Sequence, residues 1–151
     1  MKNVSLFTFF TILIIFATSC NKNKDYSQID EDIIQQYIID NNLNAAATGS
    51  GLHYVINSPG IGDTPTIYSN VTVAYTGSLI DGTVFDQSSP SGISFPLSGV
   101  IQGWQEGIPL FSEGGSGILL IPSALGYGSQ QVSAIPANSV LIFDVSLIEV
   151  N

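Results

Sequence analysis

The amino-acid sequence predicts an α+β fold, in which an antiparallel β-sheet has one short helix against it and an N-terminal helix outside it. Two patterns lead to this prediction. Apolar residues recur at spacings of three and four over residues 29–38, which is typical of an amphipathic helix. From residue 52 onward they mostly alternate with polar or small residues, and glycines and prolines punctuate the alternating segments. The second pattern indicates short strands that are joined by turns.

Residues 1–19 are typical of a signal peptide rather than of a folded element. Lys2 gives a positive start, residues 4–17 are rich in Leu, Ile and Phe, and small residues follow. The apolar run has about 14 residues, fewer than the ~20 that span a bilayer. A buried core helix is the alternative, but a run that is apolar on all sides at the end of the chain favours the signal.

Cys20 is the only cysteine, and it directly follows Ala17, Thr18 and Ser19. This segment resembles the lipobox of bacterial lipoproteins, although Ala17 stands where that motif usually has Leu. The resemblance implies cleavage before Cys20 and acylation of that cysteine, which would anchor the chain to a membrane. We therefore expect a cell-envelope protein that faces the periplasm or the exterior. A secreted protein with one free thiol is the alternative.

Residues 20–51 are expected to hold the lipidated cysteine, a tether and the N-terminal helix. Residues 21–26 are polar, and from Cys20 to Ser27 they reach at most about 25 Å. Five apolar residues then mark one face of a helix that ends near residue 41, and residues 45–51 look like a linker. The five are Ile29, Ile33, Ile34, Tyr37 and Ile38.

The start of this helix carries three consecutive acids, Asp30, Glu31 and Asp32, and Ser27 is placed to cap it. Carboxylates near a helix N-terminus interact favourably with the helix dipole. We interpret the three acids as a solvated helix start rather than as a metal site.

Residues 52–151 contain the strand candidates. Asp81-Gly82 lies between two apolar pairs, which is a strong signal for a hairpin. Only residues 100–107 suggest a second helix, and it is short. The strand candidates are residues 52–56, 71–75, 79–80, 84–85, 93–97, 117–121 and 140–150.

The charge balance excludes several functions. The chain has 12 acidic and three basic residues, for a net charge of -9, and no Lys or Arg follows Lys24. Nucleic-acid binding and phosphate-cradling loops both need cations that this part of the chain does not have. Hydrophobic residues make up 44% of the chain, which is enough for a full core, so the imbalance is not a sign of disorder.

The residues needed for covalent or metal chemistry are also scarce. His53 is the only histidine, and we expect it to be a strand residue with no catalytic role. One histidine and an acylated cysteine cannot form a transition-metal site, so we expect no metal and no cofactor. Acid–base hydrolysis by paired carboxylates stays open, but no pair stands out.

Five motifs carry a resemblance to a known family. Residues 71–79 with Asp-Gly-Thr-Val-Phe-Asp at 81–86 look like the start of an FKBP-type peptidyl-prolyl isomerase domain. Phe-Pro-Leu at 95–97 and Val-Ile-Gln-Gly-Trp-Gln-Glu-Gly at 100–107 match its middle, and residues 121–128 and 135–145 match its end. The resemblance covers residues 52–151 and implies a twisted antiparallel sheet wrapped on one short helix.

The family resemblance implies a function and a site. The function is peptidyl-prolyl cis-trans isomerisation that assists the folding of extracytoplasmic proteins, with proline-containing unfolded polypeptides as substrates and macrolides of the rapamycin type as candidate ligands. Catalytic roles are implied for Tyr75, Asp86 and Tyr127. Substrate-binding roles are implied for Phe85, Val100, Ile101, Trp104, Ile135 and Phe143, with Trp104 as the floor under the proline ring.

Alternatives stay open from the sequence alone. Trp104, Phe143, Val100 and Tyr75 also fit an ordinary core, and Asp86 is the member that an ordinary core explains least. Members of the family often have a basic residue soon after the Phe-Asp pair, whereas residues 87–92 here are Gln-Ser-Ser-Pro-Ser-Gly. A binding or chaperone module of the same fold with little turnover is the main alternative function. A structural lipoprotein with a filled pocket is the other.

Overall fold

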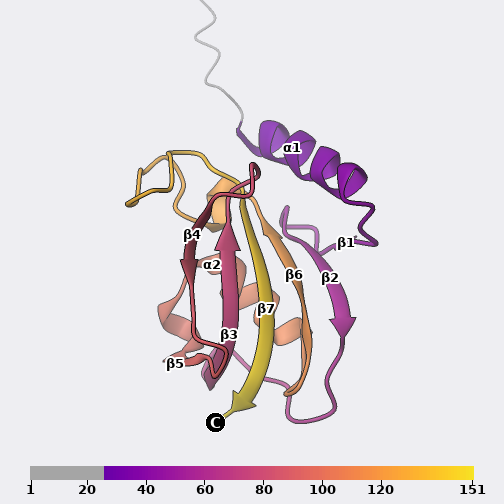
Figure 1. Ribbon diagram of the computed structural model, residues 1–151, viewed down its shortest axis with the longest axis vertical. Coiled ribbons are helices and arrows are strands. Elements are labelled where there is room, and N and C mark those ends of the chain that lie inside the picture. The colour runs from indigo at the N-terminus through magenta and orange to yellow at the C-terminus, as the bar shows by residue number, and fades with distance from the viewer. Residues whose placement is uncertain (1–25) are drawn as a thin grey trace, which may run out of the picture.

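The computed structural model describes residues 26–151, so the predicted signal peptide and the anchor at Cys20 lie outside the described residues. One antiparallel sheet dominates this part of the chain, and its strands run in the order β1-β2-β6-β7-β3-β4, with β5 paired to β3 (Figure 1). The strands are β1 (Ala46–Ala47), β2 (His53–Ser58), β3 (Asn70–Ser78), β4 (Val84–Gln87), β5 (Ile93–Pro96), β6 (Ser116–Ile121) and β7 (Leu141–Val150).

Two α-helices and three short 3₁₀ helices accompany the sheet. The long N-terminal helix α1 packs on one face of the sheet, near one end of its strands, whereas α2 packs on the opposite face (Figure 1). This arrangement confirms the predicted α+β class, with one short helix against an antiparallel sheet. The helices are α1 (Tyr26–Asp40), η1 (Leu97–Gly99), α2 (Gln102–Gly107), η2 (Ile108–Leu110) and η3 (Ser123–Leu125).

The main core lies between the sheet and α2. Successive inward residues of β7 all point into it, because side chains two apart on a strand share one face. Trp104 of α2 and Phe111, which follows η2, fill the space beneath them. The four inward residues of β7 are Leu141, Phe143, Val145 and Leu147, and each is buried.

A second, smaller core lies on the other face of the sheet, under α1. Ile34 of α1 is fully buried there against Leu120 and Ile142. The apolar run in β6 therefore has a physical reason. Leu119 faces the main core and Leu120 faces α1, so that part of the strand is covered on both faces and does not alternate.

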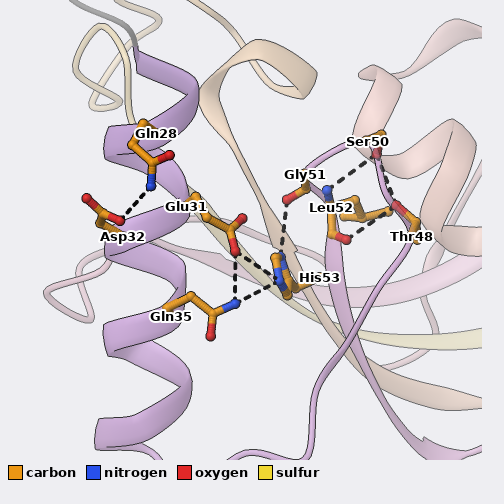
Figure 2. A network of polar contacts seen from close by, with 9 residues as sticks. All are labelled: Gln28, Glu31, Asp32, Gln35, Thr48, Ser50, Gly51, Leu52 and His53. Carbon is orange, nitrogen blue, oxygen red and sulfur yellow. Dashed lines mark hydrogen bonds and ion pairs between the residues drawn. The ribbon is translucent and has the colours of Figure 1, made fainter.

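Polar contacts also hold α1 to the sheet. Nδ1 of His53 on β2 lies 3.2 Å from the carbonyl oxygen of Gly51, and its Nε2 lies 3.1 Å from Nε2 of Gln35 (Figure 2). An oxygen of Glu31 lies 3.6 Å from the same Nε2 atom. Figure 2 shows Glu31 and Gln35 reaching from α1 toward the ring of His53. The predicted strand position of His53 is confirmed, and its side chain serves the attachment of α1.

The structure corrects two sequence expectations. The three acids of α1 are not one solvated helix start, because Asp30 is only 1% exposed and bonds to Ser123. The segment 45–51 is not purely a linker, because Ala46 and Ala47 pair with Tyr54 and His53 as a short edge strand. Among residues 26–151, no helix combines the length and the apolar character that crossing a membrane requires.

Candidate active site

A cavity of about 650 Å³ opens between the sheet and α2. Such a volume suits a small molecule or a few residues of a peptide. Strands β3, β4, β5 and β7 supply one part of its lining, and the segments at 99–104 and 127–135 supply the rest. The lining residues are Tyr75, Phe85, Asp86, Ile93, Phe95, Gly99, Val100, Ile101, Trp104, Tyr127, Val132, Ser133, Ala134, Ile135 and Phe143.

Trp104 on α2 is the hub of the aromatic cluster. Its ring centroid lies 5.0 Å from that of Tyr75, 5.1 Å from that of Phe143 and 5.5 Å from that of Phe95. The first two pairs are edge-to-face, which places the positive edge of one ring against the negative face of the other. Trp104 is only 4% exposed, and its indole N–H has no hydrogen-bond partner among residues 26–151. The position of this ring is therefore fixed by packing from three sides.

Phe85 and Phe143 form a second edge-to-face pair, with centroids 5.5 Å apart and planes at 85°. Gly77 lets them approach, since a Cβ atom there would lie 2.7 Å from one atom of each ring. Gly77 is the β3 partner of Phe143 on β7 and of Asp86 on β4. The glycine is thus needed for the close approach of these two rings.

The polar centre of the cavity is a hydrogen bond from the Tyr75 hydroxyl to Oδ2 of Asp86, at 2.7 Å. Burial, and next the bond to the Asp86 carboxylate, raise the pKa of Tyr75 to about 12. Tyr75 therefore stays a protonated donor at all physiological pH values. No Lys or Arg occurs anywhere in residues 26–151, so a tyrosine hydroxyl stands where a cationic partner of Asp86 could otherwise be found.

Val100 and Ile101 border the cavity just before α2 begins. Gln105 braces this segment, because its side-chain amide donates to the carbonyl oxygen of Val100 at 2.7 Å and to that of Ser98 at 3.3 Å. The backbone N–H of Ile101 precedes the first turn of α2, where helix N–H groups have no acceptor within the helix. This N–H group is thus available for a bound carbonyl.

Tyr127 and Ile135 lie on the segment between η3 and β7. Tyr127 is 37% exposed at the rim, whereas Ile135 is 5% exposed and packs into the core. The segment is internally bonded, since Val132 and Ile135 form an isolated antiparallel bridge. Tyr127 is thus a partly exposed member of the lining of a cavity whose interior is aromatic.

All nine residues that the sequence assigned to catalysis or substrate binding line this one cavity. The structure adds Ile93 and Phe95 of β5 to the lining, together with Gly99 and residues 132–134. The sequence marks residues 93–97 as an alternating strand and 95–97 as part of a family motif, but it assigns none of them to the site. Gln105 was also missed, because a polar residue that braces the backbone leaves no periodic signal. Cys20, predicted to be lipidated, lies outside the described residues.

No cluster of three or more His, Cys, Asp or Glu residues that could hold a metal ion occurs in the part of the chain that the structure describes. Asp86 is the only carboxylate among the lining residues. The described cavity therefore offers aromatic surface, one tyrosine–aspartate pair and hydrogen-bond donors at its rim.

Comparison with known proteins agrees with this geometry. Residues 62–148 match the family model of the FKBP-type peptidyl-prolyl cis-trans isomerases. Two proteins similar to this chain are named FKBP-type peptidyl-prolyl cis-trans isomerase FkpA. The one from Buchnera aphidicola is 48% identical over 106 residues, and the probable one from Neisseria meningitidis is 49% identical over 106 residues. These alignments cover 68% of this chain, but 42% and 39% of the two relatives.

The chain therefore spans about two fifths of the length of the curated relatives it matches. Among solved structures, the crystal structure of FkpA from Escherichia coli is similar, with a TM-score of 0.74 and 37% sequence identity. That match covers 85% of this chain and 62% of the other. The similarity thus includes the cavity and extends beyond the family model's residues.

Proposed function

The chain belongs to the FKBP-type peptidyl-prolyl cis-trans isomerase family, and from this we propose that it catalyses rotation about X-Pro peptide bonds. The observation that carries the proposal is the cavity itself. It is floored by Trp104, and the Tyr75–Asp86 pair and Tyr127 belong to its lining.

The proposed reaction needs no nucleophile, because no covalent bond is broken. The barrier of ~18–20 kcal/mol comes from the loss of amide resonance when the C–N bond twists. A twisted amide is less polar than a planar one, so an aromatic cavity favours the transition state over the ground state. Catalysis requires such a difference in binding between the two states.

The polar groups have separate roles in this proposal. The Tyr127 hydroxyl and the Ile101 N–H hold carbonyl groups next to the bond that rotates, so that one side stays fixed while the other turns. The Tyr75 hydroxyl is engaged by Asp86, which keeps both side chains oriented at the wall of the cavity. Phe85, Val100 and Phe143 enclose the proline ring, and Ile135 lies in the segment over the rim.

We further propose that the substrates are unfolded or partly folded polypeptides outside the cytoplasm. The signal-like residues 1–19 and the lipobox-like position of Cys20 support this location and a lipid anchor. Uncatalysed X-Pro exchange takes tens to hundreds of seconds, which is slow enough to limit folding. An isomerase tethered near the membrane would act on chains as they emerge there.

A protease-coupled isomerisation assay on an Ala-Leu-Pro-Phe type peptide tests the activity. The expected result is a first-order rate that rises linearly with enzyme concentration. Tyr127→Phe removes one hydroxyl at the rim and should lower kcat/KM. The matched control is Tyr68→Phe, which removes a hydroxyl from a side chain that is 90% exposed and outside the cavity, and it should leave the rate unchanged.

The alternative of a binding module predicts a different result. A folded protein that binds a macrolide of the rapamycin type, yet gives no rate above background, would support a binding or chaperone role and sink the isomerase proposal. Trp104→Ala addresses the structural alternative. A filled, inert core predicts lower stability only, whereas a working site predicts a loss of ligand affinity in a variant that is still folded.

A further inference from the structure

The helix α1 places a buried carboxylate beside the segment that carries Tyr127. Asp30 is 1% exposed, and its Oδ2 atom accepts a hydrogen bond from the Ser123 backbone N–H at 2.8 Å and from the Ser123 hydroxyl at 2.6 Å. Its Oδ1 atom has no hydrogen-bond partner among residues 26–151. The two residues are 93 positions apart, and α1 lies entirely before residues 62–148, which match the family model.

Stability alone is a weak reason for this contact. Moving a carboxylate out of water costs several kcal/mol, and attraction to donors only partly offsets that cost. Within residues 26–151 Asp30 has no Lys or Arg partner, because this part of the chain contains neither residue. An apolar side chain would cover the same surface at lower cost. The carboxylate fits instead a role that needs a directed acceptor at one particular place.

The acceptor is directed at Ser123, the first residue of η3. Other hydrogen bonds of Ser123 connect it to the backbone around Tyr127. The Ser123 carbonyl oxygen accepts hydrogen bonds from the N–H groups of Gly126, at 3.0 Å, and of Gly128, at 2.8 Å. These two glycines flank Tyr127 on both sides. Asp30 thus accepts hydrogen bonds from the N–H and O–H of Ser123, and the carbonyl of Ser123 in turn binds the backbone on either side of Tyr127.

Tyr127 needs such an anchor because of its neighbours. Glycine has a large backbone freedom, and Gly128 has a φ of +60°, in the left-handed region. A tyrosine between two glycines would sample many positions without external bonds. Asn138 supplies one further bond, from its N–H to the Gly128 carbonyl at 2.8 Å. The Gln130 N–H also donates to the Tyr127 carbonyl oxygen, at 3.3 Å. The bonds from Gly126 and Gly128, on either side of Tyr127, both end on Ser123, which Asp30 holds.

We propose that Asp30 is a positioning residue that fixes the Tyr127 hydroxyl over the cavity, so that α1 is a working part of the active site. This inference rests on the proposed isomerase function. Neighbouring contacts support it, since Ile34 anchors α1 in the second core and the His53 cluster holds the same helix to β2 (Figure 2). These contacts keep Asp30 in register with Ser123.

A double-mutant cycle in the full chain tests the proposal. Asp30→Ala should lower kcat/KM for the X-Pro peptide by about tenfold, since misplacing a substrate-orienting group by about 1 Å can cost ~100-fold and a smaller displacement costs less. In a Tyr127→Phe background, the same substitution should cost less than twofold, because the hydroxyl that it positions is already gone. Asp30→Asn keeps the shape and one acceptor, and it should lie between wild type and Asp30→Ala.

Two controls separate positioning from general stability. Asp32→Ala changes an exposed acid two residues along α1, whose carboxylate accepts a hydrogen bond from the Gln28 side chain, and it should leave kcat/KM unchanged. Val71→Ala truncates a fully buried residue at the far end of β3, so it should lower Tm without changing kcat/KM below the unfolding transition. If Asp30→Ala does not fold, Ser123→Ala takes its place in the cycle.

Amide hydrogen exchange gives a readout that does not depend on activity. The N–H groups of Gly126 and Gly128 should exchange at least tenfold faster in Asp30→Ala than in Asp32→Ala, while core strand amides keep their protection. An inactive wild type would refute the proposed function, whereas this exchange result would still test the positioning. The positioning role is wrong if exchange at both glycines is unchanged, or if the losses from Asp30→Ala and Tyr127→Phe multiply in the double variant.

Discussion

Replacing Gly77 by alanine should damage the cavity from within the sheet. The added Cβ atom would lie 2.7 Å from Cε1 of Phe143 and 2.7 Å from Cε2 of Phe85. Carbon atoms in favourable contact are ~3.5–4.0 Å apart, so both rings must retreat by about 1 Å. Such overpacking costs roughly 1–3 kcal/mol of folding free energy.

The effect on activity should exceed the effect on stability. A shift of about 1 Å in groups that hold the substrate can lower the rate by ~100-fold. Each kcal/mol lowers Tm by only about 4 °C in a domain whose size lies between roughly 100 and 150 residues. We therefore expect Gly77→Ala to be folded at 25 °C, with a Tm lowered by several degrees and a kcat/KM lowered by at least tenfold.

The assay compares Gly77→Ala with Ser78→Ala, which changes the next residue of β3, where side chains point to the opposite face of the sheet. The control should keep wild-type kcat/KM. Near-ultraviolet circular dichroism checks whether the aromatic cluster has changed. A Gly77→Ala protein with wild-type kcat/KM and Tm would show that the rings do not need their close approach, and it would refute the reasoning.

Three further results are expected. The pKa of Tyr75 is raised to about 12, so the protonated hydroxyl stabilises the fold below about pH 10, and this stabilisation is lost as the pH rises through 12. Asp86→Asn should lower the pKa of Tyr75. The absorbance of the phenolate, with Tyr75→Phe as the blank, measures this pKa. Burial raises the pKa of Asp144, so its charged form opposes folding; Asp144→Asn should raise the urea midpoint at pH 7 but not below pH ~3. Moving from ~0.01 M to ~0.15 M salt shortens the screening length from about 30 to 8 Å, and the urea midpoint should rise rather than fall.

The strands could be predicted because local patterns encode them. Alternation at residues 71–75 marked β3, and the Asp81-Gly82 turn indicated the β3–β4 hairpin with its antiparallel pairing. For these elements the information lies within about ten neighbouring residues, where the period of a strand or the chemistry of a turn is visible. The cavity residues could be assigned only through the resemblance to the FKBP-type family, because their local patterns fit an ordinary core as well.

The contacts that sequence reasoning missed are those between distant segments. The helical period places Asp30, but not Asp32, on the apolar face with Ile33 and Ile34, yet a carboxylate on that face does not reveal its partner. Only docking of α1 on η3 supplies that partner, and a helical period cannot specify which partner a face will meet. Gly77 was likewise invisible, because the need for a glycine arises from two phenylalanines on other strands.

The charge imbalance has a structural consequence that composition alone does not show. With no Lys or Arg in residues 26–151, three carboxylates accept hydrogen bonds from uncharged donors. Asp86 accepts from a tyrosine hydroxyl, Asp30 from Ser123, and Glu113 from the Val150 backbone N–H at 3.0 Å.

Hydrogen bonds of this kind connect a carboxylate to a donor fixed in the backbone or in a short side chain, so they impose direction where a flexible lysine would not. Salt screens the repulsion among exposed acids but leaves the buried Asp30–Ser123 bonds almost untouched. The domain can therefore carry an excess of acids and still hold Tyr75 and Tyr127 in place, since both orienting contacts, at Asp86 and at Asp30, use the acids as acceptors instead of as members of ion pairs.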